Sequence, residues 1–241
     1  MREAERESCI RWISGKPGGI FGGKGLYWDS TEGGKTEEVQ MNRNEKWLQC
    51  CRGGIMELMN GRPADMDSRL EKERKVYELL DELGISYQRT DHGEANTMEA
   101  CNEIDKILDV LICKNLFLCN RQQTQFYLLM MPGDKPFKTK DLSKQIGSAR
   151  LSFASPEYME KYLNIKPGAV SVMGLMNDTE NHVRLLMDRP VAEGEYLGCH
   201  PCVSTSSLKM KTKDVLEKFL PAVHHEPLMI DLPDPGAADD E

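Results

Sequence analysis

The sequence predicts a mixed α/β fold in a single domain that runs from about residue 60 to residue 230. Within these limits, segments with apolar residues at helical spacing alternate with short runs rich in β-branched and aromatic residues. The 241 residues are enough for one substantial hydrophobic core, and no internal repeat is visible.

The first helix is predicted over residues 67–84. Its apolar residues form one stripe, Asp67 or Ser68 would cap it, and Gly84 would end it. A short strand is predicted over residues 85–92. A second helix then begins near Asn96, which has Glu99 at capping-box spacing.

Two strands follow, over residues 110–119 and 125–131, joined by a polar turn. A short helix at residues 139–147 ends with Gly147. Another helix, "SPEYMEKYLN", has Ser155 as its cap, proline in its first turn and Asn164 at its end.

Two more strands are predicted over residues 169–175 and 182–188, separated by the turn-rich "MNDTEN". The segment "KTKDVLEKFLPAV" predicts the final helix. The acidic, proline-containing tail at residues 233–241 is predicted to be disordered.

Residues 1–62 differ from the rest of the chain and are predicted to be an irregular extension. They are rich in glycine, contain all three tryptophans and show no sustained periodicity. A second hypothesis is that the native chain begins at Met56 or Met59, just before the regular part. Detection of peptides from residues 1–50 in the endogenous protein would exclude that hypothesis.

Residues 18–24 match the phosphate-binding pattern G-x-x-x-x-G-K. The pattern next requires Ser or Thr for magnesium, but Gly25 stands there. No apolar strand precedes the match and no helical stripe follows it. We interpret this stretch as part of a flexible, glycine-rich leader.

Composition and charge indicate a protein of the cytoplasm. The chain is 39% hydrophobic and 29% charged, has a mean hydropathy of −0.53, and lacks the apolar core of a signal peptide at its start. No window approaches the roughly 18 apolar residues of a membrane span. The net charge of −8 excludes a protein that wraps an extended nucleic acid, but not one that touches only the end of one.

The eight cysteines are predicted to be reduced thiols, because nothing else in the chain indicates secretion. Cys199 and Cys202 form a C-x-x-C pair, a redox motif when it starts a helix after a strand. Here a strand- or loop-like segment follows, and no further ligands would complete a zinc site. A thiol oxidoreductase that uses this pair therefore stays an alternative function.

Lys114 stands inside an otherwise apolar run. In a strand it would share a face with three aliphatic residues, Ile112, Leu116 and Leu118. Lysine is almost never fully buried without a partner. Either Lys114 lies at the strand end and reaches water, or apolar walls hold its ammonium for an anionic or carbonyl-bearing ligand. Asn115 would point to the other face or into a bend.

Five stretches of the chain, in order, resemble one family. They are "ELGISYQRTDH" with Thr97 after it, "KNLFL" with "FYLLMMPGDK", "LSFASPEYMEKYLNIKPGAVSVMGLMND", "VRLLMD" and "GCHPCVSTSSLKM". Over residues 70–232 the sequence resembles the YbaK/prolyl-tRNA-synthetase-associated editing domains, and among them the freestanding ProX/PrdX-type deacylases. The resemblance implies a YbaK-like domain at residues 63–232, with a curved mixed β-sheet flanked by helices.

The resemblance also implies hydrolysis of the ester that joins an amino acid to the 3′ end of tRNA. That ester is already activated, so positioned water and a stabilised oxyanion suffice, with no metal and no other cofactor. The implied partners are mischarged tRNA, gripped at its acceptor end, and prolyl-tRNA synthetase as a further candidate; no membrane and no DNA is implied. The "KNLFL" and "GxHP" motifs are most similar to those of alanine-clearing members, which favours Ala-tRNA-Pro.

By the same resemblance, Lys114 inherits the role of the family's essential lysine, at the phosphate or sugar of the terminal nucleotide. Asn115 inherits a supporting role, and His200 matches a histidine that helps to shape the amino-acid pocket. The implied substrate-binding residues are Thr97, Gly168, Ala169, Val170, Ser171, Val172, Gly198, Pro201 and Ser204. Val172 stands where proline is usual, and Ser204 where many members have asparagine.

Two questions stay open at this point. The basic residues Lys135, Lys138, Lys140, Lys144 and Arg150 are either contacts for the tRNA backbone or a solvated face. In addition, a non-catalytic module of the same fold would bind tRNA or a synthetase without hydrolysing anything. The two departures at residues 172 and 204 favour such a module, whereas the presence of Lys114 and His200 favours catalysis.

Overall fold

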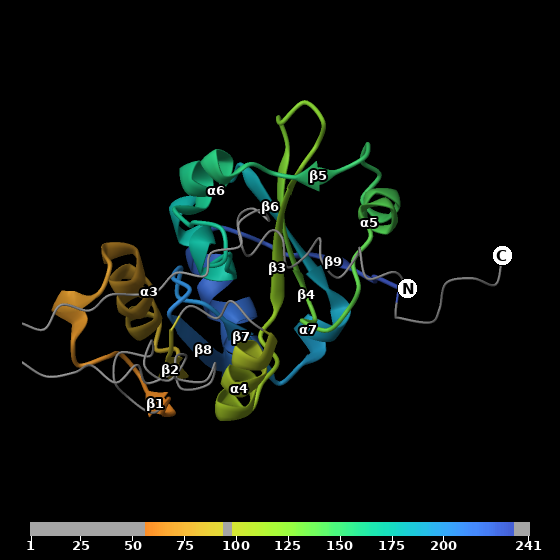
Figure 1. Ribbon diagram of the computed structural model, residues 1–241. Helices are drawn as coiled ribbons and strands as arrows, with labels where there is room; N and C mark the ends of the chain where they lie inside the picture. The colour runs from red at the N-terminus through yellow and green to blue at the C-terminus, as the bar shows by residue number, and fades with distance from the viewer. Residues whose placement is uncertain (1–55, 94–97, 234–241) are drawn as a thin grey trace, which may run out of the picture. The chain divides into compact units, whose positions relative to one another are not determined.

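The computed structural model describes residues 56–93 and 98–233, and within them the mixed α/β class is confirmed (Figure 1). The strands lie in two hydrogen-bonded sheets, with helices against their faces. The predictions for the glycine-rich leader, the cap at Asn96, Thr97 and most of the acidic tail fall on residues outside these ranges. No helix in the described residues is long and apolar enough to cross a membrane.

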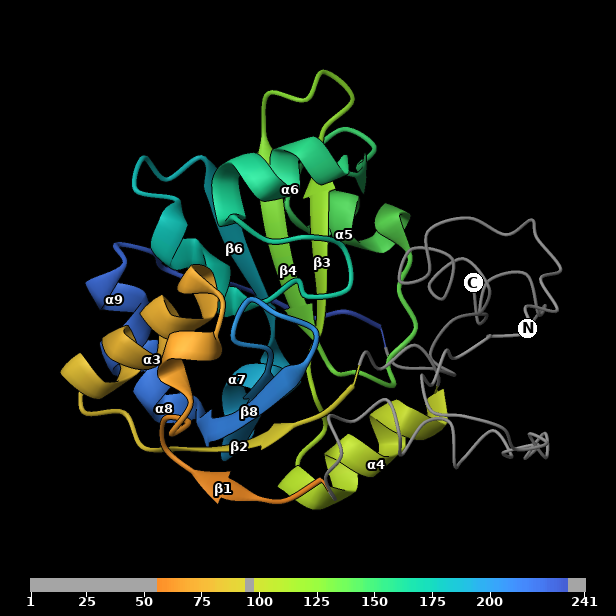
Figure 2. The same cartoon turned by 60° about the vertical axis from the view of Figure 1, so that its left-hand side comes forward.

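The smaller sheet is antiparallel and has the order β1-β2-β8-β7. Its strands are β1 (Met59–Asn60), β2 (Tyr87–Asp91), β7 (Tyr196–Cys199) and β8 (Ser206–Lys211). Helix α3 (Glu71–Glu82) covers one face and α4 (Met98–Leu108) lies against the other (Figure 2). Successive residues of β8 therefore face different helices.

The larger sheet is mixed and has the order β5-β3-β4-β6-β9. Its strands are β3 (Lys114–Cys119), β4 (Phe126–Met131), β5 (Ser152–Phe153), β6 (Val183–Asp188) and β9 (Leu228–Ile230). Strand β4 pairs antiparallel with β3 and parallel with β6, and every residue of β4 is buried. Burial on both faces explains its continuous apolar run.

The larger sheet carries helices on both faces. Helix α6 (Pro156–Leu163) packs Tyr158 and Tyr162 on the ring of Phe126, at centroid distances of 4.7 and 4.9 Å. Helix α5 (Thr139–Gln145) buries Leu142 against the other face, in a core cluster with Leu129. The remaining helical segments are η1 (Met66–Ser68), η2 (Val172–Asn177), α7 (Arg189–Glu193), α8 (Thr212–Asp214), η3 (Val215–Phe219) and α9 (Leu220–Ala222).

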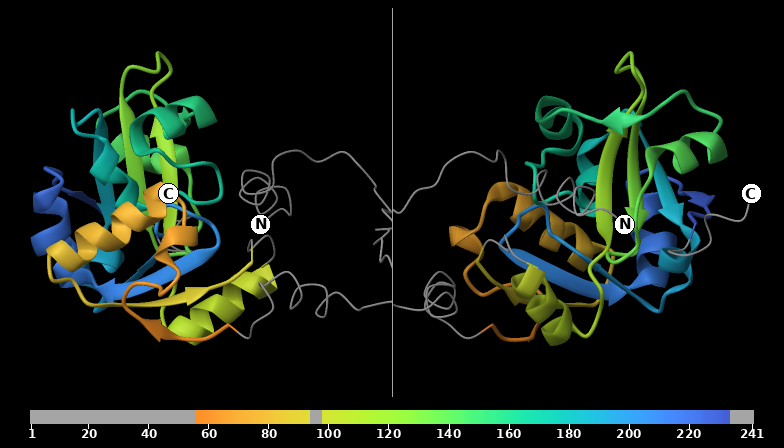
Figure 3. Two further views of the ribbon diagram at one scale, coloured as in Figure 1. Left: turned by 90° about the vertical axis from the view of Figure 1, so that its left-hand side faces the viewer. Right: turned by 45° about the vertical axis from the view of Figure 1, so that its right-hand side comes forward.

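Strand β3 begins beside the smaller sheet and runs away from it, as both views of Figure 3 show. The contact is an isolated parallel bridge between Ile112 and Gly198, in which the N–H of Cys113 donates to the carbonyl oxygen of Gly198 at 2.9 Å. A side chain at Gly198 would put its Cβ 3.0 Å from the Cα of Ile112. Glycine therefore lets the two sheets meet at this point.

Most predicted elements are confirmed, with shifted ends. Gly84 and Gly147 end their helices with φ of 60° and 62°, and Asn164 does so with φ of 54°. The cap prediction for the first helix was wrong. Helix α3 starts at Glu71, and the Ser68 hydroxyl contacts Asp65 instead.

The predicted strand at residues 169–175 was wrong. Its first residues belong to a turn, in which the N–H of Ala169 donates to the carbonyl of Lys166 at 3.1 Å and Gly168 has φ of 90°. From Val172 the chain forms the 3₁₀ helix η2. Val172 packs into the core from the first position of this helix, whose start the Ser171 hydroxyl caps by accepting from the N–H of Met173, whereas Val170 lies before the helix and is partly exposed.

Candidate active site

The bridge between Ile112 and Gly198 brings two predicted site residues to one place. The two segments are parallel there, so Lys114 and His200 each follow two residues beyond the bridge in the same direction. Gly198 itself is buried in the junction and provides close backbone approach. The structure thus brings together the "KNLFL" and "GCHP" motifs, which lie more than 80 residues apart in the sequence.

Lys114 is the first residue of β3 and is half-buried. Its Nζ donates to the carbonyl oxygen of Lys135 at 2.8 Å. In the described part of the chain Lys114 forms no ion pair with a carboxylate. The ammonium is therefore anchored by a neutral group, and its charge stays available to an anionic ligand.

Lys135 corrects one prediction from the sequence. Its side chain is only 6% exposed, and its Nζ donates to the buried carboxylate of Asp188 at 2.9 Å. Lys135 is therefore no contact for a tRNA backbone; its carbonyl oxygen instead positions Lys114. The other basic residues of that group, Lys138, Lys140, Lys144 and Arg150, are exposed.

Asn115 points to the opposite side of the strand from Lys114. Its Nδ2 donates to the carbonyl oxygen of Cys113 at 3.0 Å. Its Oδ1 is buried, and no donor in the described residues reaches it. A buried acceptor without a partner costs about 1–3 kcal/mol of folding free energy. A ligand that donates a hydrogen bond to Oδ1 of Asn115 would recover this cost.

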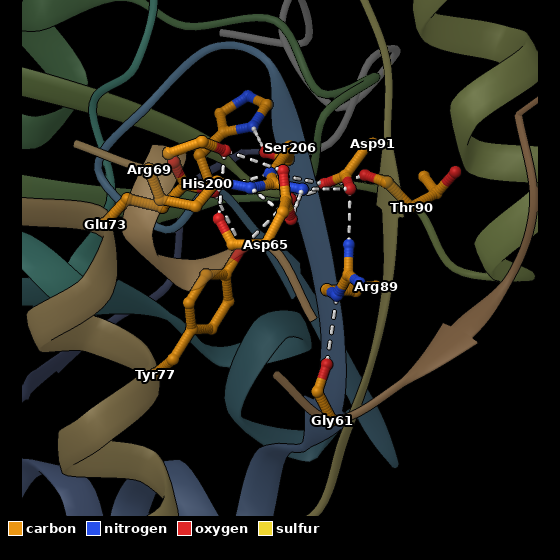
Figure 4. A network of polar contacts seen from close by, with 11 residues as sticks. Gly61, Asp65, Arg69, Glu73, Tyr77, Arg89, Thr90, Asp91, His200 and Ser206 are labelled. Carbon is orange, nitrogen blue, oxygen red and sulfur yellow. Dashed lines mark hydrogen bonds and ion pairs between the residues drawn. The ribbon is translucent and has the colours of Figure 1, made fainter. Parts of the chain in front are cut away.

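His200 lies in the turn between β7 and β8 and is half-buried. Its Nδ1 is 3.0 Å from the carbonyl oxygen of Ser206 and 3.2 Å from the hydroxyl of Ser207. Burial lowers the pKa of His200, so the imidazole is neutral at neutral pH. Figure 4 shows the other ring nitrogen of His200 pointing away from Ser206.

A network of polar contacts on the α3 side of the smaller sheet supports Ser206 (Figure 4). Tyr77 donates its phenol hydrogen to Glu73 at 3.0 Å, and its oxygen lies 3.3 Å from the Ser206 hydroxyl. Arg69 contacts Glu73 at 3.0 Å and Asp91 at 2.6 Å. These buried groups hold the start of β8, and with it the carbonyl that contacts His200.

The turn at residues 168–172 reaches the same junction through Ser171. Burial raises the pKa of the Cys199 thiol, directly before His200, and the neighbouring Ser171 hydroxyl opposes that rise, so the two side chains lie close together. Ala169, Ser171 and Val172 are buried, whereas Gly168 and Val170 are partly exposed. The predicted substrate loop thus lies next to the histidine motif.

The "CHPC" pair lies in an environment that opposes thiol chemistry. Cys199 and Cys202 are both fully buried, and burial raises the pKa of each thiol, to about 12 for Cys202. Thiol exchange needs an accessible thiolate. Pro201 is buried beside them, Ser204 is half-buried, and Cys202 has φ of 61°, so this segment forms a tight turn.

Two residues of the site, His92 and Ser207, were not predicted from the sequence. His92, directly after β2, has its Nε2 2.8 Å from the hydroxyl of Ser207, which also contacts His200. The rings of His92 and His200 are 6.3 Å apart. The histidine of "RTDH" at a strand end was a visible signal, but its contact with a serine 115 residues away requires the folded chain.

Several known proteins are similar to this chain. The family model for the aminoacyl-tRNA editing domain matches residues 92–218. Prolyl-tRNA editing protein ProX of Acetoanaerobium sticklandii is 34% identical over 158 residues, which cover 66% of this chain and 93% of that protein. Prolyl-tRNA synthetase associated domain-containing protein 1 of Danio rerio is 28% identical over 170 residues, covering 70% and 88% of the two chains.

Among solved structures, that of a candidate trans-editing enzyme for prolyl-tRNA synthetase matches 70% of this chain and 100% of its own, with a TM-score of 0.51 and 15% identity. At that identity the similarity concerns the fold alone.

Proposed function

This chain belongs to the aminoacyl-tRNA editing domain family, and from that premise we propose that it is a deacylase which edits mischarged tRNA-Pro in trans. Water attacks the carbonyl carbon of the aminoacyl ester, the bond to the ribose oxygen breaks, and that oxygen takes up a proton. The products are a free amino acid and a tRNA with a free 3′ end. The reaction belongs to the cytoplasm, where translation takes place.

The observation that carries the proposal is the convergence of Lys114, His200 and the turn at residues 168–172 at the bridge between the sheets. The ammonium of Lys114 is anchored on a carbonyl oxygen, which suits it to contact the phosphate or sugar of the terminal nucleotide. Asn115 points to the other side of the strand, so we assign it an indirect supporting role; no donor in the described residues reaches its buried acceptor. His200 and the turn form the side at which the amino acid binds.

The remaining assignments belong to the same proposal. The substrate-binding set comprises Thr97, Gly168, Ala169, Val170, Ser171, Val172, Gly198, Pro201 and Ser204. For the domain we take residues 56–232 instead of the predicted start at residue 63, because β1 pairs with β2 and the carbonyl of Gly61 accepts from Arg89 at 3.0 Å. Lys138, Lys140, Lys144 and Arg150 are exposed, and we assign them to contact with the acceptor end of the tRNA.

Alanine is the proposed amino acid, on the resemblance of the "KNLFL" and "GCHP" motifs to alanine-clearing members. A pocket that discriminates by a methyl group supplies only about 1–3 kcal/mol, so related small amino acids will compete. Release of labelled amino acid from Ala-, Cys- and Pro-tRNA-Pro tests this. We expect the highest kcat/KM for the alanyl ester, and a higher value for the cysteinyl or prolyl ester would contradict the choice.

The second candidate function is a non-catalytic module that binds tRNA or prolyl-tRNA synthetase. The specific observation in its favour is the pair of departures at Val172 and Ser204. The same panel separates the two: turnover of any mischarged tRNA-Pro supports the deacylase. Tight binding of mischarged tRNA without turnover would establish the module instead.

A further inference from the structure

The ammonium of Lys114 depends on one backbone group for its place. Its Nζ donates to the carbonyl oxygen of Lys135 at 2.8 Å, and within residues 56–93 and 98–233 the ammonium makes no other hydrogen bond. Lysine carries its charge on a flexible four-carbon stem, so the group that binds the charge decides where it lies. The position of the backbone at Lys135 therefore sets the position of the charge of Lys114.

Lys135 belongs to a turn that brings its carbonyl back to the start of β3. Strand β4 ends opposite Lys114 in the antiparallel register. The N–H of Lys135 then donates to the carbonyl oxygen of Pro132 at 3.2 Å and closes the turn. A Cβ at Gly133 would lie 2.6 Å from the carbonyl oxygen of Ile112, so this turn packs closely on the backbone that precedes Lys114.

Asp188, the last residue of β6, holds the far end of the Lys135 side chain. The Nζ of Lys135 donates to Oδ2 of Asp188 at 2.9 Å, and the N–H of Leu232 donates to Oδ1 at 2.9 Å. Lys135 is 6% exposed, and Asp188 is fully buried. Removal of one partner from a buried ion pair leaves an uncompensated charge in the protein interior. Separation of Lys135 from Asp188 within the core is therefore strongly unfavourable.

We propose that Asp188 is a positioning residue for Lys114. Through its ion pair with Lys135, it fixes the carbonyl oxygen on which the ammonium of Lys114 is anchored. A buried ion pair often adds no net stability over apolar side chains of similar volume, so its contribution here is the defined place of both partners. The effect on hydrolysis rests on the proposed function. Asp188 itself does not touch the substrate.

The first test is hydrogen exchange with water at the Lys114 ammonium, read from ¹H–¹⁵N spectra of the full chain, with Lys114→Arg for assignment. We expect slower exchange in the wild type than at exposed Lys213. Asp188→Asn keeps an acceptor for the N–H of Leu232 but removes the charge that holds Lys135. Exchange at Lys114 should then rise about tenfold, the worth of one hydrogen bond.

Asp231→Asn is the matched control for the loss of charge. Its carboxylate is exposed and pairs with Arg189 at 2.6 Å. Exchange at Lys114 should be the same in this variant as in the wild type. Equal exchange in the wild type and Asp188→Asn would overturn the inference, as would exchange in the wild type as fast as at Lys213.

The second test separates positioning from a purely structural role. Single-turnover release of alanine from Ala-tRNA-Pro is compared in the wild type, Asp188→Asn, Lys114→Ala and the double variant. If Asp188 acts through Lys114, Asp188→Asn lowers the rate about tenfold in the wild type and leaves the rate of Lys114→Ala unchanged. An equal loss in both backgrounds would show that Asp188 acts on the fold alone and would overturn the inference.

A further variant, Lys135→Met/Asp188→Asn, leaves no buried charge without a partner, so it decides the question if Asp188→Asn does not fold. We expect its urea unfolding midpoint to be close to that of the wild type, with fast exchange at Lys114. Slow exchange in this folded variant would overturn the inference. The exchange measurement needs no tRNA, so its outcome is distinguishable from failure of the proposed function, in which the wild type would hydrolyse no mischarged tRNA-Pro.

Discussion

Val172 is one of the two positions at which the resemblance predicts another residue, and its backbone suits the proline expected there. It is the first residue of η2, and Ser171 before it is extended, with φ of −151° and ψ of 150°. Proline requires an extended residue before it and fits the first helical position. We expect Val172→Pro to change the free energy of unfolding by less than about 1 kcal/mol and to retain deacylation, measured by urea unfolding and alanine release.

Met173→Pro is the matched control for that substitution. The N–H of Met173 donates to the Ser171 hydroxyl at 3.2 Å, so proline there removes a buried hydrogen bond at the start of η2. A loss of about 3 kcal/mol is expected. If Val172→Pro destabilised the protein as much as Met173→Pro, the loop would not have the conformation described above.

The sequence showed which single residues are candidates for the site, but not which groups they contact. Lysine in an apolar run was enough to single out Lys114, yet nothing near it in the sequence indicated the carbonyl of Lys135 as its anchor. Lys135 was predicted either to contact the tRNA backbone or to lie on a solvated face, and both alternatives require an exposed side chain. Its burial depends on Asp188, 53 residues away, which only the folded sheet brings within reach.

Among the elements, the junction of β3 with β7 depends most on one small residue. A Cβ at Gly198 would lie 3.0 Å from the Cα of Ile112 and 3.1 Å from the carbonyl oxygen of Leu111, both of which are backbone atoms. We expect Gly198→Ala to destabilise the protein by about 1–3 kcal/mol and to impair deacylation, because it separates Lys114 from His200.

Gly194→Ala provides the comparison for the junction. At Gly194 a Cβ meets its nearest neighbour at 3.5 Å, which is ordinary contact. Urea unfolding should show little change for that variant. Similar losses for the alanine variants of Gly194 and Gly198 would mean that close approach at the junction is not the cause.

A second link between elements depends on pH. The carboxylate of Asp178 accepts from the N–H of Val183 at 2.7 Å, at the start of β6, and from His225 at 3.2 Å, just after α9. Burial alone would lower the pKa of His225, but the hydrogen bond with Asp178 and the negative charge of that group outweigh it, so the pKa is raised.

The raised pKa sets the sign of the pH dependence. Stability contributed by charged His225 is complete below its unfolded pKa of about 6.5 and is lost as the pH rises through the higher folded-state value. The wild type should therefore exceed His225→Gln in free energy of unfolding by more at about pH 6 than at about pH 9. Urea denaturation at both pH values measures this, and a constant difference would refute the linkage.

At the scale of the whole molecule, the described domain contains every candidate residue of the site except Thr97. We expect a chain of residues 56–241 to deacylate Ala-tRNA-Pro as the full chain does, because β1 and the junction of the sheets are retained. Steady-state kinetics of the two chains measures this. Loss of activity with unchanged urea unfolding would show that residues 1–55 contribute to the reaction.

The sequence predicted the fold where local signals decide it, and failed where distant contacts do. Helices with an apolar stripe and a glycine or asparagine at their end were placed correctly, as at Gly84 and Asn164. The segment after Gly168 has the composition of a strand, but the cap by Ser171 and its place in the core make it helical. The contacts of Ser207 with His92 and His200 join three segments of the chain and leave no local pattern.

We propose that Lys114, held at the junction of the two sheets, serves hydrolysis of an aminoacyl ester. Release of alanine from Ala-tRNA-Pro under single-turnover conditions, by the wild type and by Lys114→Ala, tests it most directly. Lys213→Ala is the control, because Lys213 is exposed and pairs only loosely with Glu217, at 3.8 Å. We predict a loss of about 100-fold or more for Lys114→Ala and none for Lys213→Ala. Equal rates for the wild type and Lys114→Ala would contradict the account.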